Sequence, residues 1–257
     1  MIYPDQNRPR TVLPQFLSMP TDKPLQISRW FLRLAGTRIF IHHQDRIPPD
    51  IPLLVISNHR SFMDAPLLMA ALERPIHFAT HHYMGKVPVV NHLITQELGC
   101  FPIDTPDRRQ HSFFHQTIPL LHNGAAVGIF PEGAPPMLHR TPPHTVGEFH
   151  RGFAHLALRA QIPNLAILPV AISSLEETTY YPMPTRILSL FDPTEPLFQQ
   201  DGNHPVVIYH GVRILIGHPY WITQSDRQSY HGKQGKTAVN QILHHTHTQI
   251  TTLLHQP

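Results

Sequence analysis

Cysteine is nearly absent: the 257 residues include only Cys100. An internal disulfide is therefore impossible, and a zinc site built on cysteine ligands is excluded. Histidine is abundant, with 22 residues, but they are scattered along the chain. The densest group, His244, His245 and His247, is better explained as a solvated helical face than as a metal site.

Charge is also scarce, because charged residues make up only 14% of the chain, against roughly 25% in a typical soluble domain. The formal net charge is +3, and only four of the 20 basic residues are lysines. A surface whose positive charge comes mainly from arginine suits phosphate groups, anionic lipid or an acidic carrier protein. The excess is too small to predict a nucleic-acid partner.

Long apolar runs are missing as well. No stretch reaches the roughly 18 apolar residues of a membrane span, and the start, "MIYPDQNRPRTVLPQF", lacks the apolar core of a signal peptide. These features predict a cytoplasmic protein or one on the cytoplasmic face of a membrane. Residues 1–23 are rich in proline and are expected to form a tail, followed by a single domain over residues 24–257.

Several familiar catalytic motifs do not occur in this sequence. There is no G-x-S-x-G elbow, which argues against an ordinary α/β-hydrolase. There is no P-loop, no G-x-G-x-x-G and no H-E-x-x-H. The chemistry must therefore come from other residues.

Short apolar runs alternate with amphipathic segments through most of the chain. We expect strands at 51–57, 76–80, 100–104, 125–130, 165–172 and 212–217, and helices at 64–73, 87–98, 108–122, 152–160 and 235–254. This alternation predicts an α/β fold with a central, mostly parallel sheet flanked by helices. Sites in such sheets gather where strands end. "NHRSFMD", "FPID" and "FPEG" all follow apolar strands, so they are expected at one edge.

An N-terminal amphipathic helix is expected within residues 24–40. Ile27, Trp30, Phe31 and Leu34 recur at helical spacing, and Gly36 is expected to end the helix. Such a stripe fits a helix docked on the core, or an interfacial helix in a lipid headgroup layer. Both interpretations stay open, and different faces of the helix can serve each.

His59 and Asp64, in "NHRSFMDAP", are the first candidates for catalysis. A histidine can take a proton from an alcohol near neutral pH, and a carboxylate can fix its tautomer. On a regular helix, residues five apart point roughly 140° from each other, so His59 must fold back from the loop before the helix. The alternatives are a loop histidine and a capping box from Ser61 to Asp64. Glu132 is a further candidate for the site. Because it follows a proline, the alternative interpretation is a carboxylate at the start of a helix.

Four short motifs, taken together in their order along the chain, make a catalytic role for these residues more specific. "NHRSFMD" (58–64), "GCFPID" (99–104), "FPEG" (130–133) and "ILPVAI" (167–172) resemble, in sequence and order, the blocks of the 1-acylglycerol-3-phosphate acyltransferase family within the glycerolipid acyltransferases. The likeness is close over about residues 50–175, the motif-bearing core, and loose at both ends. Ordered blocks are far more specific than any single one.

The resemblance implies acyl transfer from an acyl-carrier-protein or coenzyme A thioester to the free hydroxyl of a lysoglycerolipid, foremost 1-acylglycerol 3-phosphate, which gives phosphatidic acid. His59 would be the general base and Asp64 its partner. Glu132 and Gly133 would help to bind the acceptor. The partners implied are membrane lipid and the acyl donor, with peripheral association at the cytoplasmic face; the chemistry needs no metal and no other cofactor.

Two positions depart from the family pattern. Thr105 and Pro135 stand where the family commonly has arginines that it is thought to use on the acceptor phosphate. Arg108, Arg109, Arg140 or Arg151 are candidate replacements, and Arg60 is a further basic candidate inside the first block. The departures leave two alternatives open: an acyltransferase acting on another lysolipid or alcohol, and a catalytically inactive lipid-binding member of the fold.

Overall fold

The structure of the chain is a computed structural model. It describes residues 10–11, 22–80, 95, 97–103, 109–133, 135–138, 141–184, 186–187, 199 and 202–256. Most of the expected proline-rich tail and most of the expected helix at 87–98 lie outside these residues. Among the described residues, no helix combines the length and apolar character needed to cross a bilayer.

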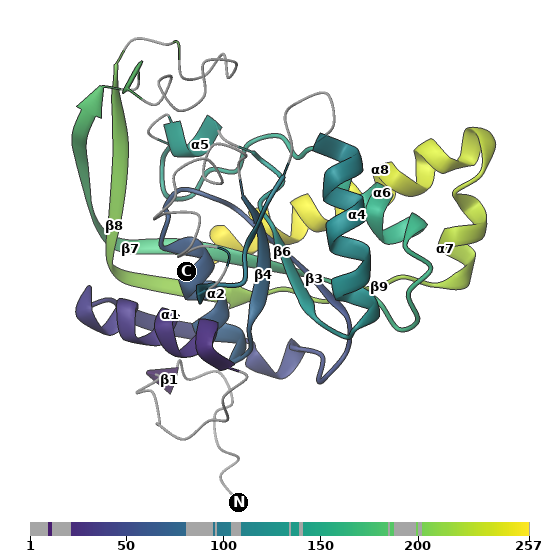
Figure 1. The fold of residues 1–257 in the computed structure, drawn as a ribbon, viewed down its shortest axis with the longest axis horizontal. Coiled ribbons are helices and arrows are strands. Elements are labelled where there is room, and N and C mark those ends of the chain that lie inside the picture. The colour runs from purple at the N-terminus through teal and green to yellow at the C-terminus, as the bar shows by residue number, and fades with distance from the viewer. Residues whose placement is uncertain are drawn as a thin grey trace, which may run out of the picture.

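One curved sheet forms the centre of the molecule (Figure 1). Its strands are β1 (Arg10–Thr11), β2 (Arg38–His42), β3 (Leu53–Ser57), β4 (Ile76–Thr80), β5 (Phe101–Pro102), β6 (Ala126–Ile129), β7 (Ala166–Pro184), β8 (Asn203–Ile216) and β9 (Tyr220–Trp221). The order is β1-β2-β8-β7-β3-β6-β4-β5, and β9 pairs with β7. The pairs from β7 through β5 are all parallel, as is β2–β8. The predicted mostly parallel sheet is therefore confirmed.

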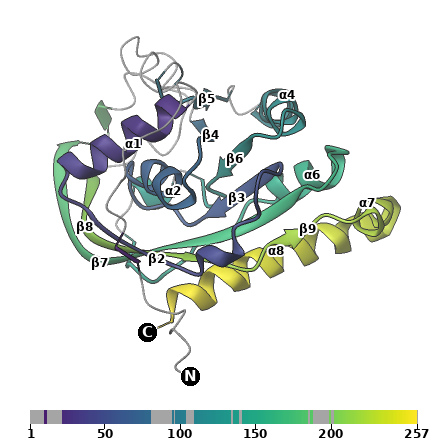
Figure 2. The same ribbon diagram turned by 90° about the horizontal axis from the view of Figure 1, so that it is seen from below.

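Helices cover both faces of this sheet (Figure 2). The helices of the described residues are α1 (Lys23–Leu34), α2 (Asp64–Leu72), α4 (Arg109–His122), α5 (Pro135–Leu138), α6 (Gly152–Arg159), α7 (Gln224–Ser229) and α8 (Gly232–Leu254). Residues of α1 and α2 pack in one hydrophobic cluster, and residues of α4, α6 and α8 pack in another. The alternating side chains of β3 divide between the two clusters, so the clusters lie on opposite faces.

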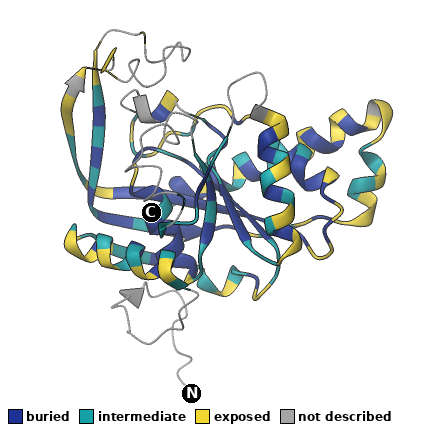
Figure 3. Cartoon of the chain, viewed as in Figure 1, coloured by how far each residue is buried: buried dark blue, intermediate teal, exposed yellow. Residues whose placement is uncertain are grey.

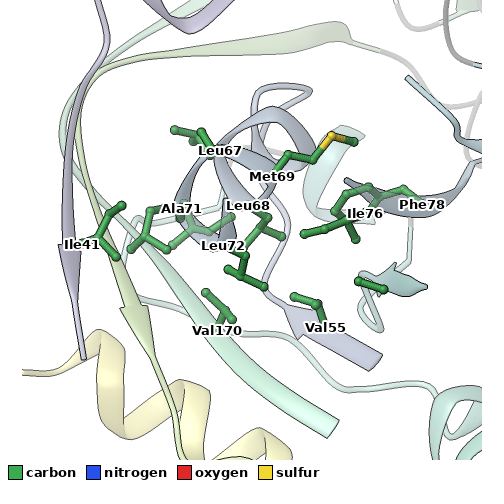
Figure 4. Packing of buried hydrophobic residues seen from close by; sticks show 14 of the residues in the cluster. Ile41, Val55, Leu67, Leu68, Met69, Ala71, Leu72, Ile76, Phe78 and Val170 are labelled. Carbon is green, nitrogen blue, oxygen red and sulfur yellow. The ribbon is translucent and has the colours of Figure 1, made fainter. Parts of the chain in front are cut away.

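Strand β3 explains why the sheet could be predicted. All five of its residues are buried, as expected for a parallel strand with helices on both sides. Val55 lies with Leu68 of α2 and Val170 of β7 in the cluster of Figure 4. This packing fixes the point at which β3 ends and the "NHRSFMD" segment begins.

Helix α1 has two apolar sides. Leu25 and Leu32 are buried in the core, whereas Trp30 is 61% exposed and Leu34 is 67% exposed. Figure 3 shows buried and exposed positions along the same helix. The helix ends at Leu34, and Gly36 adopts the left-handed conformation, as predicted. Residues 38–40, the end of the expected segment beyond Gly36, belong to β2 (Arg38–His42), a strand that the sequence prediction did not include.

The largest difference from the sequence prediction is the hairpin of β7 and β8. The predicted strands end at 172 and begin at 212, but the structure continues their antiparallel pairing to Pro184 and Asn203. In β7 the extension is largely polar and exposed, so no apolar run marks it, whereas in β8 it includes the apolar run Val206–Tyr209, which the sequence prediction overlooked. Figure 1 shows the hairpin rising beside the sheet edge that carries the candidate site.

Candidate active site

The carboxyl ends of β3 and β6 bring two of the sequence motifs together. The strands are parallel neighbours, so the segments that follow them leave the sheet side by side. The backbone N–H of His59 donates to Oε1 of Glu132 at 3.0 Å. The predicted convergence of "NHRSFMD" and "FPEG" is therefore confirmed. Asp104, at the end of "FPID", lies outside the described residues.

His59 folds back onto Asp64. Nδ1 of His59 lies 2.8 Å from Oδ2 of Asp64, the first residue of α2. The same oxygen accepts the backbone N–H groups of Arg60 at 2.7 Å and Ser61 at 2.8 Å. Asp64 is fully buried, and 18% of the His59 side chain is exposed. The carboxylate thus organises the loop, as half of a capping box does, and also orients the imidazole.

Aromatic packing fixes the plane of the imidazole. The ring of His59 stacks on Phe130 with centroids 4.0 Å apart, and Phe130 stacks on Phe78 at 5.2 Å. Gly128 makes room for this arrangement, because a Cβ at that position would overlap the Phe78 ring. The catalytic candidate therefore sits at the end of a packed column that the sheet itself supports.

Glu132 holds two loops together. Its Oε2 accepts the backbone N–H of Gly147 at 2.6 Å, while its Oε1 accepts that of His59. Burial raises the pKa of Glu132, and the two N–H groups oppose this rise. Gly133, in the left-handed conformation, completes the turn. Both carboxylate oxygens are engaged within the chain, which favours a role in positioning His59 over direct acceptor contact.

Arg60 is buried and fully engaged. Its guanidinium forms a two-point contact with Glu177 of β7, with both distances 2.8 Å. It also donates to the backbone oxygen of Thr141 from Nε at 3.1 Å and from Nη2 at 2.8 Å. A phosphate would have to displace one of these partners. The contacts favour a structural role, in which Arg60 ties the His59 loop to the hairpin.

The remaining motif positions and basic candidates fall partly outside the described residues. Arg108, Arg140 and Thr105 lie outside the described residues, and Arg109 begins α4 with a side chain that is not described. Pro135 begins the short α5, so no basic group occupies that motif position. Arg151 is exposed at the start of α6.

Four contributors to the site were missed in the sequence. Glu177, Thr141 and Gly147 act only through the fold, and no local pattern marks them. The fully buried Tyr209 of β8 is the fourth. Burial and the neighbouring Asp64 carboxylate raise the pKa of Tyr209 well above its ordinary value, so its phenol stays protonated beside the pair.

This geometry suits general-base chemistry. With Nδ1–H donated to Asp64, Nε2 of His59 is left to take a proton from a hydroxyl. Cys100 does not offer a nucleophile, because burial raises the pKa of its thiol to about 11. The arrangement therefore favours direct attack by an activated substrate hydroxyl over a covalent intermediate on the protein.

Comparison with curated proteins finds relatives that are named 1-acyl-sn-glycerol-3-phosphate acyltransferases. The chain is 29% identical to a probable 1-acyl-sn-glycerol-3-phosphate acyltransferase of Mycoplasma genitalium over 57% of this chain and 52% of that protein. It is 25% identical to the enzyme of that name from Borreliella burgdorferi over 58% of this chain and 55% of that one. It is 29% identical to the human 1-acyl-sn-glycerol-3-phosphate acyltransferase beta over 60% of this chain and 54% of that one. The chain thus spans about half the length of these relatives.

A solved structure shares the fold. The 1-acyl-sn-glycerophosphate acyltransferase of Thermotoga maritima superposes with a TM-score of 0.57 at 18% identity, covering 91% of this chain and 80% of that one. The family model named Acyltransferase matches residues 38–173, more than half of the chain, and its range includes the His59–Asp64 pair and Glu132. The chain belongs to this acyltransferase family.

Proposed function

We propose that this protein transfers a fatty acyl group from a thioester donor to the free hydroxyl of a lysoglycerolipid, with 1-acylglycerol 3-phosphate as the acceptor and phosphatidic acid as the product. The 2.8 Å contact between His59 Nδ1 and Asp64 Oδ2 carries the proposal. The names of the relatives support the choice of acceptor. The intact pair argues against an inactive lipid-binding member of the fold.

In the proposed reaction, Nε2 of His59 removes the proton of the acceptor hydroxyl as its oxygen attacks the thioester carbonyl. Asp64 stabilises the imidazolium that forms and holds its tautomer. When the carbon–sulfur bond breaks, the thiol leaves with the proton returned from His59. Glu132 contributes by fixing the backbone of His59, and Phe130 by fixing its ring plane.

A second acceptor class deserves a test. The motif positions at Thr105 and Pro135 carry no arginine, and Arg60 is saturated by Glu177 and Thr141. Without a free arginine at these positions, recognition of a phosphomonoester would depend on other cations. A different lysolipid, or another alcohol, is therefore the alternative acceptor.

We also propose peripheral association with the cytoplasmic face of a membrane. Trp30 and Leu34 expose apolar surface on α1, and Phe62, in the catalytic segment itself, is 46% exposed. Phe62 contacts Phe31 of α1 with ring centroids 5.9 Å apart, so the helix packs directly against the His59 loop. An interfacial helix in this place would bring a lipid acceptor to the base.

The test is a matrix of donors and acceptors with the purified protein. Acyl carrier protein and coenzyme A thioesters are each combined with 1-acylglycerol 3-phosphate, lysophosphatidylcholine and an uncharged lysoglycolipid. The proposal predicts phosphatidic acid as the fastest-formed product. Preferred turnover of an uncharged acceptor would support the alternative class, and no acylation of any acceptor would overturn both.

A further inference from the structure

A cavity of about 310 Å³ lies between α6 and the start of α8, apart from the catalytic pair. His155 and Arg159 of α6 line it together with Arg151, the residue just before that helix, and the three are spaced four residues apart. Lys236 of α8 lines the other side, and Tyr230 lies just before that helix. No carboxylate is among the described residues that line this cavity.

The three cations of the cavity, Arg151, Arg159 and Lys236, have no acidic partner among the residues that the structure describes. None of the ion pairs found in the described part of the chain involves Arg151, Arg159 or Lys236. Burial lowers the pKa of His155, and the positive charges of Arg159 and Arg151 lower it further. A cleft lined by charge of one sign concentrates counter-ions of the other sign.

Aromatic contacts hold this cationic surface in place. The guanidinium of Arg159 lies 5.8 Å from the ring centroid of Tyr230 and 5.9 Å from that of Phe114. The Tyr230 hydroxyl lies 2.7 Å from Nδ1 of His155. Tyr230 and Arg159 are therefore tied to α6 before any ligand arrives, which reduces the ordering cost of binding.

The first turn of α8 completes the cavity. Gly232 and Gly235 line it. A Cβ on Gly235 would lie only 3.1 Å from the backbone oxygen of Tyr230, so glycine permits the close approach of the helix. The N-terminus of this 23-residue helix adds a partial positive charge to the three cations.

We propose that the cavity between α6 and α8 is a binding site for a phosphate group, formed by Arg151, Arg159 and Lys236 with the first turn of α8. The site is distinct from the catalytic pair, because α6 and α8 cover the opposite face of the sheet from α2, which carries Asp64. Planar guanidinium groups recognise phosphate oxygens through paired hydrogen bonds.

The phosphate has two sources among the ligands of the proposed reaction. A coenzyme A donor carries phosphates on its nucleotide, far from its thioester, and a second lipid molecule carries one on its headgroup. The acceptor that reacts at His59, in contrast, has its phosphate too close to its hydroxyl to reach the opposite face. Free phosphate is a third source. The identity of the molecule that supplies the phosphate rests on the proposed function, whereas the binding of phosphate itself does not.

The binding test uses calorimetric titration of the whole chain with inorganic phosphate, adenosine 3′,5′-bisphosphate and glycerol 3-phosphate. Arg159→Gln and Lys236→Gln should each weaken binding of the preferred ligand about tenfold. Arg33→Gln removes an equal charge from the exposed face of α1 and should change binding less than about twofold. If the nucleotide binds most tightly, the site belongs to the donor. If glycerol 3-phosphate binds most tightly, it belongs to the headgroup of a second lipid molecule, and equal binding of all three assigns it to free phosphate.

A second readout locates the ligand. The His155 ring, identified by its loss in His155→Asn, should titrate at higher pH when phosphate is bound, because the anion offsets Arg151, Arg159 and Lys236. Binding unchanged in both variants, or a His155 titration unmoved at saturating phosphate, would overturn the site. These measurements do not involve turnover, so failure of the acylation assay would leave them intact.

Discussion

Oδ2 of Asp64 lies 2.8 Å from Nδ1 of His59 and also accepts the backbone N–H groups of Arg60 and Ser61. A single buried oxygen therefore shapes the loop and orients the base. Its position alone does not separate the structural effect of Asp64 from its effect on the reaction. Substitutions that change charge but keep shape do separate them.

Asp64→Asn keeps a carbonyl oxygen for the loop but loses the negative charge. We expect the rate to fall on the order of 10²–10³, because Asn no longer stabilises the imidazolium and can hold the wrong tautomer. We expect a loss of about 1–3 kcal/mol in the free energy of unfolding, since the bonds from the loop to a charged group become neutral ones. Initial rate and urea unfolding are measured on the same preparation. A rate near that of the wild type would leave Asp64 as a loop anchor only.

Glu132→Gln should reveal the cost of the buried carboxylate. Because the folded-state pKa of Glu132 is raised above its ordinary 4.5, the folded chain binds that proton more tightly than the unfolded chain does. This contribution to stability is present below pH 4.5 and is lost as pH rises through the folded pKa. The free energy of unfolding of the wild type should therefore fall relative to that of the variant as pH is raised.

Denaturant unfolding of both proteins, from about pH 4 to about pH 7, measures this difference. Comparing the two cancels the titration of groups that they share. If the free energy of unfolding of the wild type instead rises relative to that of Glu132→Gln as pH is raised, the pKa of Glu132 is lowered in the fold, and the prediction is contradicted.

The contact between Arg60 and Glu177 is expected to be strongly coupled. Only 4% of the Arg60 side chain and 16% of the Glu177 side chain are exposed. Removing one partner leaves the other charge poorly compensated, a loss of about 3–5 kcal/mol for buried pairs. The double variant Arg60→Gln with Glu177→Gln should lose less than the sum of the single variants.

Arg38 and Glu176 provide the matched control for this cycle. Glu176 is next to Glu177 on β7, and its pair with Arg38 of β2 is exposed, with side-chain values of 58% and 63%. Its coupling energy should be at most about 1 kcal/mol. If the Arg60 cycle gives no more than this, the buried contact does not hold the loop. If Arg60→Gln raises the Michaelis constant for a phosphate-bearing acceptor while Glu177→Gln does not, Arg60 reads the acceptor instead.

The two sides of α1 should respond differently to polar substitution. Trp30→Ser with Leu34→Ser removes exposed apolar surface, so binding to anionic liposomes should fall with little change in melting temperature. Phe31→Ser, whose side chain packs against the core and Phe62, should lower the melting temperature. Liposome sedimentation and thermal unfolding are measured on both. Unchanged sedimentation of the double variant would count against the interfacial helix.

The sequence predicted the elements that bury apolar side chains. Strand β3 and helix α2 were correctly placed because nearly every residue in them is buried. The extension of β7 beyond Ile172 was missed because its side chains from Leu175 to Pro182 are exposed or only partly buried, and strand propensity without burial is a weak signal. Residues 38–42 were missed for a related reason: a short strand after an amphipathic helix continues its apolar pattern.

Within the candidate site, local and distant contributions separate in the same way. His59 and Asp64 lie five residues apart in one motif, so ordered motifs were enough to pair them. Arg60 was assigned to the acceptor because its partner, Glu177, is 117 residues away and nothing in the sequence links the two. Glu132 was found by its motif, but its contacts to His59 and Gly147 needed the parallel neighbours β3 and β6.

The most direct test of the account is the rate of phosphatidic acid formation from an acyl thioester and 1-acylglycerol 3-phosphate by the wild type and His59→Ala. The ring of His59 is partly exposed and its backbone N–H survives the substitution, so circular dichroism and melting temperature should change little. The account predicts a rate lower by about 10²–10⁴, the usual contribution of a general base. A folded His59→Ala protein within a few-fold of the wild-type rate would contradict it.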